Sequence, residues 1–300
     1  MTAPLRICVV TDGKPGHQNQ SLGLAEAIQR TTPTDISVFK LPAGKIRPLG
    51  ILETPSPKPD LFIGAGHTTH APLLQFARRT GSPCVVLMKP SLPSPLFDLC
   101  LIPEHDLGHR PTPPNVFPTK GALNRVPPPD PGRSRESGLI LIGGPSGSHG
   151  WDGERIAECV AAIVKSRIDL PWKLTDSRRT PPGDLEKLSE WVTCHPHAET
   201  GPDWLPRELG AAREVWVTED SVSMIYEALS SGASVGLLPV PRRQKSSRLS
   251  RGVDGLVTSG RLIRFEDWIP GDPLPKSQNP LREADRAASM VLQHLFPHRL

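Results

Sequence analysis

Short apolar runs alternate with segments of helical spacing along most of this chain. Four of the runs are Leu5–Val10, Asp60–Gly64, Leu139–Ile142 and Glu214–Thr218. Runs that lack a polar alternation suit strands buried on both faces of a parallel sheet. The helical segments between them, such as Ser21–Arg30, suit crossover helices. The alternation therefore predicts an α/β fold built from βαβ units.

A proline-rich segment divides this alternation into two halves. Residues 111–135 contain eight prolines and few apolar residues, and the alternation starts again after them. A length of 300 residues suits two domains of ~100–200 residues each. We predict two Rossmann-like domains, 1–135 and 136–300, that face a central cleft. We expect the apolar face of the last helix, Leu281–Phe296, to return to the N-terminal domain.

Composition excludes several classes of protein. The net charge of +4, with one tyrosine and seven phenylalanines, offers little to a nucleic acid. The five cysteines are odd in number and far apart, which favours free thiols in a reducing compartment over disulfides. No apolar stretch approaches the ~20 residues of a membrane-spanning helix, and the N-terminal apolar run is too short for a signal peptide. These features predict a cytoplasmic protein.

A local run of basic residues leaves a second location open. Five cations lie close together in the sequence, at Arg242, Arg243, Lys245, Arg248 and Arg251. On its own the run favours the solvated face of a helix, and the alternative is a patch that binds phosphates or an anionic membrane. Under the second interpretation the protein is also peripheral at the inner face of the membrane.

The turn after the first predicted strand is the first candidate site. Gly13 and Gly16 allow a sharp turn and a close approach to a ligand. Lys14 adds a cation, and the following helix offers unbonded N–H groups. Asp12 and His17 would stand at the carboxyl edge of the sheet, where doubly wound folds bind ligands. A plain turn with surface side chains is the alternative.

The turn after the first strand of the second half is the second candidate site. Gly143, Gly144, Ser146 and Ser148 offer backbone amides and hydroxyls in the order expected of an anion-binding nest. The turn joins a buried strand to a helix, which favours this interpretation over a flexible loop.

The third candidate site is the start of a helix after Glu214–Thr218. Ser221 and Ser223 lie in or next to its first turn, where hydroxyls and amides can hold phosphate oxygens. Glu227 follows Ser223 by four residues and so shares its face. Asp220 is an alternative N-cap to Ser221, and Gly232 suits the helix end. A capped helix with an exposed glutamate is the alternative.

Other polar segments give weaker signals. GAGHTTH, from Gly64 to His70, resembles the start of a dinucleotide fingerprint, but Thr69 takes the place of its third glycine. His195 and His197 lack the HExxH or paired-cysteine context of a zinc site. We therefore predict neither a nicotinamide cofactor nor a bound metal.

Several of these segments together resemble one family. TDGKPGHQNQSLGLAEAI, GAGHTTH, IGGPSGSHGWD, SRRTPP and VTEDSVSMIYEALSSG are similar to segments of the mitochondrial fission (elongated-mitochondria) proteins, a family with a plant member and many bacterial ones. The resemblance runs from about Ile7 to Leu238.

That family is similar in turn to GT-B glycosyltransferases. The resemblance implies a GT-B-like fold whose C-terminal domain holds a nucleotide-sugar, UDP-linked, as co-substrate. It implies that Ser221 and Ser223 hold the diphosphate and that Glu227 holds the ribose. Gly144, Ser146 and Ser148 would lie beside them.

We therefore expect a glycosyltransferase that moves a sugar to an acceptor hydroxyl without a metal. His17, or an acidic neighbour such as Asp12, would deprotonate the acceptor, and Lys14 or Arg178 would stabilise the leaving diphosphate. The acceptor would be lipid-linked or part of the cell envelope. The plant member is linked to recruiting a dynamin-like protein, so a non-catalytic adaptor for a membrane-remodelling partner is the alternative.

Overall fold

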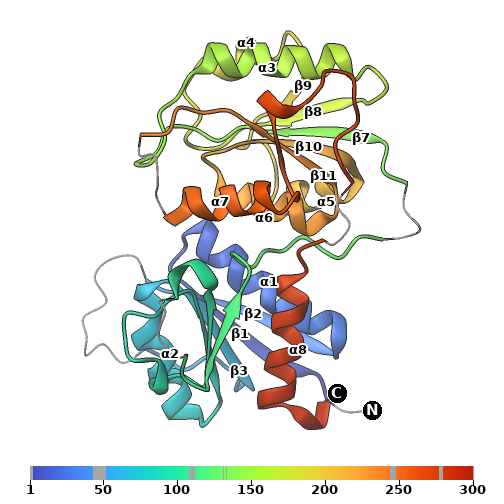
Figure 1. Cartoon of the computed structure of the whole chain (residues 1–300). Coiled ribbons are helices and arrows are strands. Elements are labelled where there is room, and N and C mark those ends of the chain that lie inside the picture. The colour runs from blue at the N-terminus through green and yellow to red at the C-terminus, as the bar shows by residue number, and fades with distance from the viewer. Residues whose placement is uncertain are drawn as a thin grey trace. The chain divides into compact units, whose positions relative to one another are not determined.

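The computed structural model describes residues 3–42, 52–107, 112–130, 132, 134–243, 248–276 and 280–299. The chain forms two compact units (Figure 1). Unit 1 comprises Met1–Arg125 and Arg282–Leu300, and unit 2 comprises Val126–Leu281. Each contains a six-stranded sheet, so the prediction of an α/β fold with two Rossmann-like domains is confirmed. The division falls at Arg125, before the predicted boundary at residue 135.

The sheet of unit 1 has the strand order β2-β1-β3-β4-β5-β6, and all its strands are parallel. Its strands are β1 (Leu5–Thr11), β2 (Thr34–Lys40), β3 (Leu61–Ala65), β4 (Cys84–Leu87), β5 (Leu99–Pro103) and β6 (Val116–Thr119). The sequence did not predict β6, which lies in the proline-rich segment. Pro118 is tolerated there because β6 is an edge strand, where a missing N–H leaves no neighbour unpaired.

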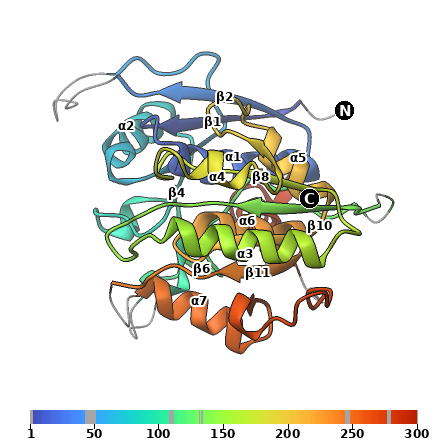
Figure 2. The ribbon, with the colours of Figure 1, turned by 90° about the horizontal axis from the view of Figure 1, so that it is seen from above.

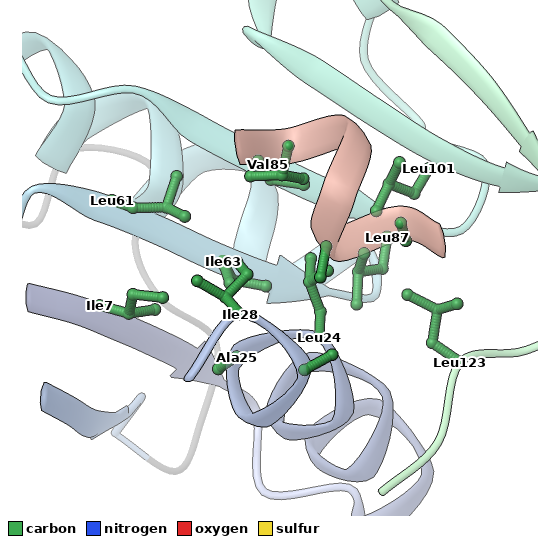
Figure 3. Close-up of a cluster of buried hydrophobic side chains, with 14 of the residues drawn as sticks. Ile7, Leu24, Ala25, Ile28, Leu61, Ile63, Val85, Leu87, Leu101 and Leu123 are labelled. Atoms are coloured by element: carbon green, nitrogen blue, oxygen red, sulfur yellow. The ribbon is translucent and has the colours of Figure 1, made fainter. Parts of the chain in front are cut away.

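Helices cover both faces of this sheet. α1 (Pro15–Thr31) and α8 (Glu283–Leu295) pack on one face, and α2 (His70–Thr80) packs on the other. Figure 3 shows the first interface, where Leu24 and Ile28 of α1 meet Ile63 of β3. Burying each such side chain contributes roughly 1.5–3 kcal/mol. α1 begins at Pro15, well before the predicted start at Ser21, because proline is favoured in the first turn.

The C-terminal helix α8 belongs to unit 1 although it follows unit 2 in the sequence. Its apolar face, which includes Ala288, Val291 and Leu292, joins the cluster that contains α1. Arg30 of α1 donates to the Asp285 carboxylate of α8 at 2.7 Å.

The sheet of unit 2 has the order β12-β11-β10-β7-β8-β9, again all parallel. Its strands are β7 (Ser137–Leu141), β8 (Trp172–Thr175), β9 (Thr193–His195), β10 (Ala212–Thr218), β11 (Ser234–Leu238) and β12 (Ile263–Arg264). The sequence predicted β7 and β10 from Leu139–Ile142 and Glu214–Thr218, and β8 and β11 from the further runs Trp172–Thr175 and Ser234–Leu238. It did not predict β9 and β12, which are too short to show a periodic pattern.

The helices of unit 2 are α3 (Gly153–Ser166), α4 (Asp184–Leu188), α5 (Trp204–Ala211), α6 (Val222–Ser231) and α7 (Arg248–Thr258). α3 and α4 lie on one face of the sheet, and α5, α6 and α7 lie on the other (Figures 1 and 2). α6 ends at Ser231, and the φ of +78° at the next residue, Gly232, confirms the predicted left-handed C-cap. Within the described ranges, no helix is long and apolar enough to cross a membrane.

Candidate functional site

Parallel pairing brings two distant segments of unit 1 together. Val10 of β1 pairs with Gly64 of β3, so both strands end at the same edge of the sheet. Asp12 follows β1, and the short 3₁₀ helix His67–Thr69 follows β3. Side chains more than fifty residues apart in the sequence therefore share one site.

The Asp12 carboxylate holds the His17 imidazole. Nδ1 of His17 lies 3.1 and 3.0 Å from the two carboxylate oxygens, and the two side chains are 8% and 19% exposed. Because an ionised carboxylate only accepts hydrogen bonds, Nδ1 is the donor. Nε2 is then the nitrogen that can take a proton from another molecule.

The surroundings of Asp12 keep it ionised. Burial by itself would raise the pKa of Asp12, but three donors outweigh it and lower that pKa below its usual value. They are the Lys14 backbone N–H at 3.1 Å, the Thr68 hydroxyl at 3.0 Å, and His17. Asp12 is thus a carboxylate at neutral pH, as the pairing with His17 requires.

The two glycines of this turn have different roles. Gly13 has a φ of +80°, and a Cβ there would lie 3.2 Å from Cε of Lys40, so this position requires glycine. A Cβ on Gly16 would meet nothing within 4 Å. Lys14 and Lys40 add positive charge at the start of α1. Lys40 was not predicted from the sequence, because it ends a neighbouring strand.

In unit 2 the backbone amides of the glycine turn are hydrogen-bonded to side chains of the protein, which closes the turn. The Gly143 N–H donates to the Thr218 hydroxyl at 2.7 Å, and the Gly144 N–H donates to Oδ2 of Asp220 at 3.0 Å. Both amides, which we expected to face a phosphate, are therefore already bonded. The glycines are needed for close packing, because a Cβ on Gly143 would overlap the carboxylate oxygens of Asp220.

The serines of the same turn form a small polar cluster. The hydroxyls of Ser146 and Ser148 lie 3.3 Å apart, and each side chain is partly exposed. Each hydroxyl also contacts His149, one through its backbone N–H and the other through Nδ1, both at 3.1 Å. Burial lowers the pKa of His149, so this imidazole is neutral at pH 7. The two hydroxyls belong to side chains of this turn that remain partly accessible.

The structure brings Arg179 to the turn, and not Arg178, which we predicted from the sequence. The Arg179 guanidinium pairs with Asp220 at 2.7 Å and donates to the Gly144 carbonyl. Arg178 is exposed. Adjacent arginines in a loop cannot be told apart by spacing, so only the fold could make this choice.

The start of α6 has backbone N–H groups without a partner in the helix. Ser221 occupies the N-cap position, but its side chain makes no capping hydrogen bond. The first hydrogen bond of the helix joins the Ile225 N–H to the Ser221 carbonyl. The N–H groups of Val222, Ser223 and Met224 precede it and have no partner within the helix, and Ser223 is exposed.

Glu227 lies one turn after Ser223 on the same face of α6. Its side chain is partly buried, and burial raises the pKa of its carboxyl to about 7. A group that is half protonated near neutral pH can both donate and accept hydrogen bonds.

One residue of the basic run, Arg242, belongs to a network of ion pairs within the protein. Arg242 pairs with Glu219 and also with Asp254, the latter at 2.7 Å. Arg264 pairs with the same two carboxylates at 2.8 and 2.5 Å. Arg242 is thus held by carboxylates of the protein. Arg243 and Arg251 are exposed. Lys245 and the side chain of Arg248 lie outside the described residues.

The histidines considered as metal ligands have other partners. Nδ1 of His197 lies 3.1 Å from Asp176, and the ring of His195 packs on Trp204. Across the ranges that the structure describes, no group of three or more His, Cys, Asp or Glu side chains could hold a metal ion.

Two parallel-sheet units, each with polar turns at the carboxyl edge of its strands, define a GT-B-like α/β protein. The chain belongs to the mitochondrial fission ELM1 family, whose sequence model matches residues 15–295. This confirms the family resemblance inferred from the motifs. No curated protein matched the chain in a sequence search.

Solved structures share this fold at low sequence identity. A candidate UDP-N-acetylglucosamine 2-epimerase from Listeria monocytogenes is 16% identical with a TM-score of 0.61, over 99% of this chain and 97% of that chain. S. aureus MnaA, solved with UDP, is 16% identical with a TM-score of 0.49, over 97% and 89%. Phytolacca americana UGT2, solved with UDP-2-fluoro-glucose and pterostilbene, is 13% identical with a TM-score of 0.47, over 97% and 90%. The fold assignment rests on the first of these.

Proposed function

We propose that this protein is a GT-B-type glycosyltransferase that moves a sugar from a nucleotide-sugar to an acceptor hydroxyl. The observation that carries the proposal is the pairing of His17 with a buried, ionised Asp12 at the carboxyl edge of unit 1. A carboxylate that holds Nδ1 leaves Nε2 basic and fixed in direction, which is the arrangement a general base requires.

In the proposed reaction, Nε2 of His17 takes the proton of the acceptor hydroxyl. The acceptor oxygen then forms a bond to the anomeric carbon of the sugar. The bond between that carbon and the diphosphate oxygen breaks, and its electron pair leaves with the nucleoside diphosphate. Asp12 stabilises the resulting imidazolium.

The donor is assigned to unit 2 and the acceptor to unit 1. The start of α6, where Ser221 is buried and Ser223 is exposed, offers N–H groups and hydroxyls to the diphosphate of a UDP-linked sugar. Glu227 is placed one turn further on for a ribose hydroxyl. Ser146 and Ser148 provide further hydroxyls.

The charge on the leaving diphosphate is assigned to protein groups and not to a metal. The candidates are the dipole of α6, Arg178 or Arg179 in unit 2, and Lys14 in the first turn of unit 1. Gly13 and Gly16 would let the acceptor approach the backbone of that turn. Gly143, Gly144 and Asp220 contribute by holding the second turn in place, since their hydrogen bonds are made within the protein.

A lipid-linked or envelope acceptor remains our proposal, and with it a cytoplasmic protein that contacts the inner face of the membrane. The exposed Arg243 and Arg251 support it, because cations near a surface favour anionic lipids by about 1 kcal/mol each.

Thermal shift with a panel of nucleotides and nucleotide-sugars tests the donor site. A ligand at one hundred times its Kd should stabilise the protein by about 2.7 kcal/mol, and we expect this of UDP and of one UDP-sugar. With that sugar and candidate acceptors, His17→Ala should abolish transfer while the UDP-dependent shift persists. No stabilisation by any nucleoside diphosphate would refute the proposal. Binding without transfer by the wild type would favour the adaptor function.

A further inference from the structure

The segment Gly66–His70 contacts the Asp12–His17 pair in a way that no sequence motif suggested. Gly66 follows β3 with a φ of +88°. A Cβ there would lie 2.3 Å from Cε1 and 2.4 Å from Nδ1 of His17. The imidazole therefore packs directly on the Gly66 backbone, in space that any side chain would fill.

Thr68 supports the other member of the pair. Its hydroxyl donates to Oδ2 of Asp12 at 3.0 Å, and Oδ2 is also the oxygen nearest to Nδ1 of His17. The hydroxyl thus restrains the carboxylate that holds the imidazole. Its donation also contributes to the lowered pKa of Asp12.

The rest of the segment anchors these two residues. Thr69 is fully buried, and its hydroxyl and its backbone N–H both donate to the Gly66 carbonyl, at 2.8 and 3.0 Å. His70 is buried, and its Nδ1 lies 3.0 Å from the Ser91 hydroxyl. Hydrogen bonds therefore hold the turn that carries Gly66 and Thr68 in place.

We propose that Gly66 and Thr68 are positioning residues that set the tautomer and direction of the His17 imidazole. This inference rests on the proposed role of His17 as the general base. Gly66 admits the ring to its place above the backbone, and Thr68 prevents the Asp12 carboxylate from turning away. A chain that lacks either one would keep both members of the pair but lose their alignment.

Matched variants separate positioning from general damage to the fold. Gly66→Ala places a methyl group against His17. Gly81→Ala also introduces a side chain at a positive φ, +70°, where a Cβ meets nothing within 4 Å. It controls for alanine at a positive-φ turn, although the ψ of 16° at Gly81 differs from the ψ of 151° at Gly66. Thr68→Val removes the hydroxyl at nearly constant shape, and Thr68→Ser retains it.

Long-range ¹H–¹⁵N spectra of the histidine rings report the His17 tautomer without any substrate. Wild type, Gly81→Ala and Thr68→Ser should show neutral His17 protonated at Nδ1. Gly66→Ala and Thr68→Val should lose that pattern in whole or in part. Where transfer is measurable, kcat should fall roughly tenfold or more in these two variants, with KM changed less than about twofold.

An unchanged tautomer and rate in both Gly66→Ala and Thr68→Val would overturn the inference. So would an equal loss in Gly81→Ala, because the effect would then be general strain. If the tautomer responds as expected but the wild type transfers no sugar, the positioning role stands and the proposed function fails.

Discussion

The turns after the first strands of the two units look alike in sequence and are closed in different ways. In unit 1, the Gly13 N–H donates to Thr11 and the Lys14 N–H donates to Asp12, so the turn is closed by its own neighbours. In unit 2, the amides of Gly143 and Gly144 donate to side chains at the end of β10, some 75 residues later.

This difference decides what each turn leaves for a ligand. In unit 1, the Lys14 N–H occupies only part of the hydrogen-bonding capacity of the Asp12 carboxylate. The same carboxylate also holds the imidazole of His17. In unit 2, Asp220 occupies the position that an external anion would take at Gly144. The open donors of unit 2 therefore lie at the start of α6. A glycine-rich turn binds anions only if its amides are not already bonded within the protein.

We expect the largest effect from a substitution that breaks the Asp12–His17 pair of unit 1. Asp12→Asn retains the size of the side chain but lets Nδ1 of His17 act as an acceptor, which favours the wrong tautomer. Transfer should fall about 10²–10⁴-fold, measured as kcat/KM.

The matched control is Asp176→Asn, which alters the Asp–His pair of unit 2. Its rate should stay within about threefold of the wild type, in the range of a minor structural change. Equal losses in both variants would show that the two pairs are not functionally distinct.

Substitution of a glycine in the second turn should affect stability. Gly143→Ala places a Cβ 2.3 Å from Oδ2 of Asp220, so the carboxylate must move from the Gly144 amide. We expect a loss of about 2–3 kcal/mol in the free energy of unfolding, measured by urea denaturation. In Gly147→Ala the Cβ meets nothing within 4 Å, and the change should be below about 0.5 kcal/mol. A small loss in both would mean that Asp220 does not close the turn.

The raised pKa of Glu227 predicts a stability that depends on pH. Its carboxyl has a pKa of about 7 in the folded chain against an ordinary 4.5, so the wild type loses stability as pH rises from 4.5 to 7. Glu227→Gln should not show this loss, because a glutamine side chain does not ionise. It should be more stable than the wild type by about 1–3 kcal/mol at pH 8, with little difference below pH 4.5. Denaturation curves at pH 8 and below pH 4.5 measure the difference in the free energy of unfolding between the variant and the wild type. If that difference is the same at both pH values, the prediction is contradicted.

The smallest expected effect tests the start of α6 as the open anion site of unit 2. Ser223→Ala removes one exposed hydroxyl, worth about 0.5–1.5 kcal/mol in binding. Calorimetry should show UDP binding weakened about two- to tenfold, with an unchanged melting temperature. Unaltered affinity would place the diphosphate elsewhere in unit 2.

Much of the fold could be predicted from local patterns. The central strands β1, β3 and β10 are mostly apolar, because both of their faces are largely buried. Edge strands gave no such signal: β9 and β12 are short, and β6 contains Pro118.

By itself, the sequence determined the α/β class, the family, and Asp12 and His17 as candidate catalytic residues of one turn, because these depend on short-range spacing and on residue types along the chain. Only the tertiary structure decided that Thr68 supports Asp12, that Arg179 and not Arg178 reaches Asp220, and that Asp220 fills the second turn. Each of these contacts joins the ends of different strands. Parallel pairing and register bring such residues together, and no local spacing in the sequence encodes that distance.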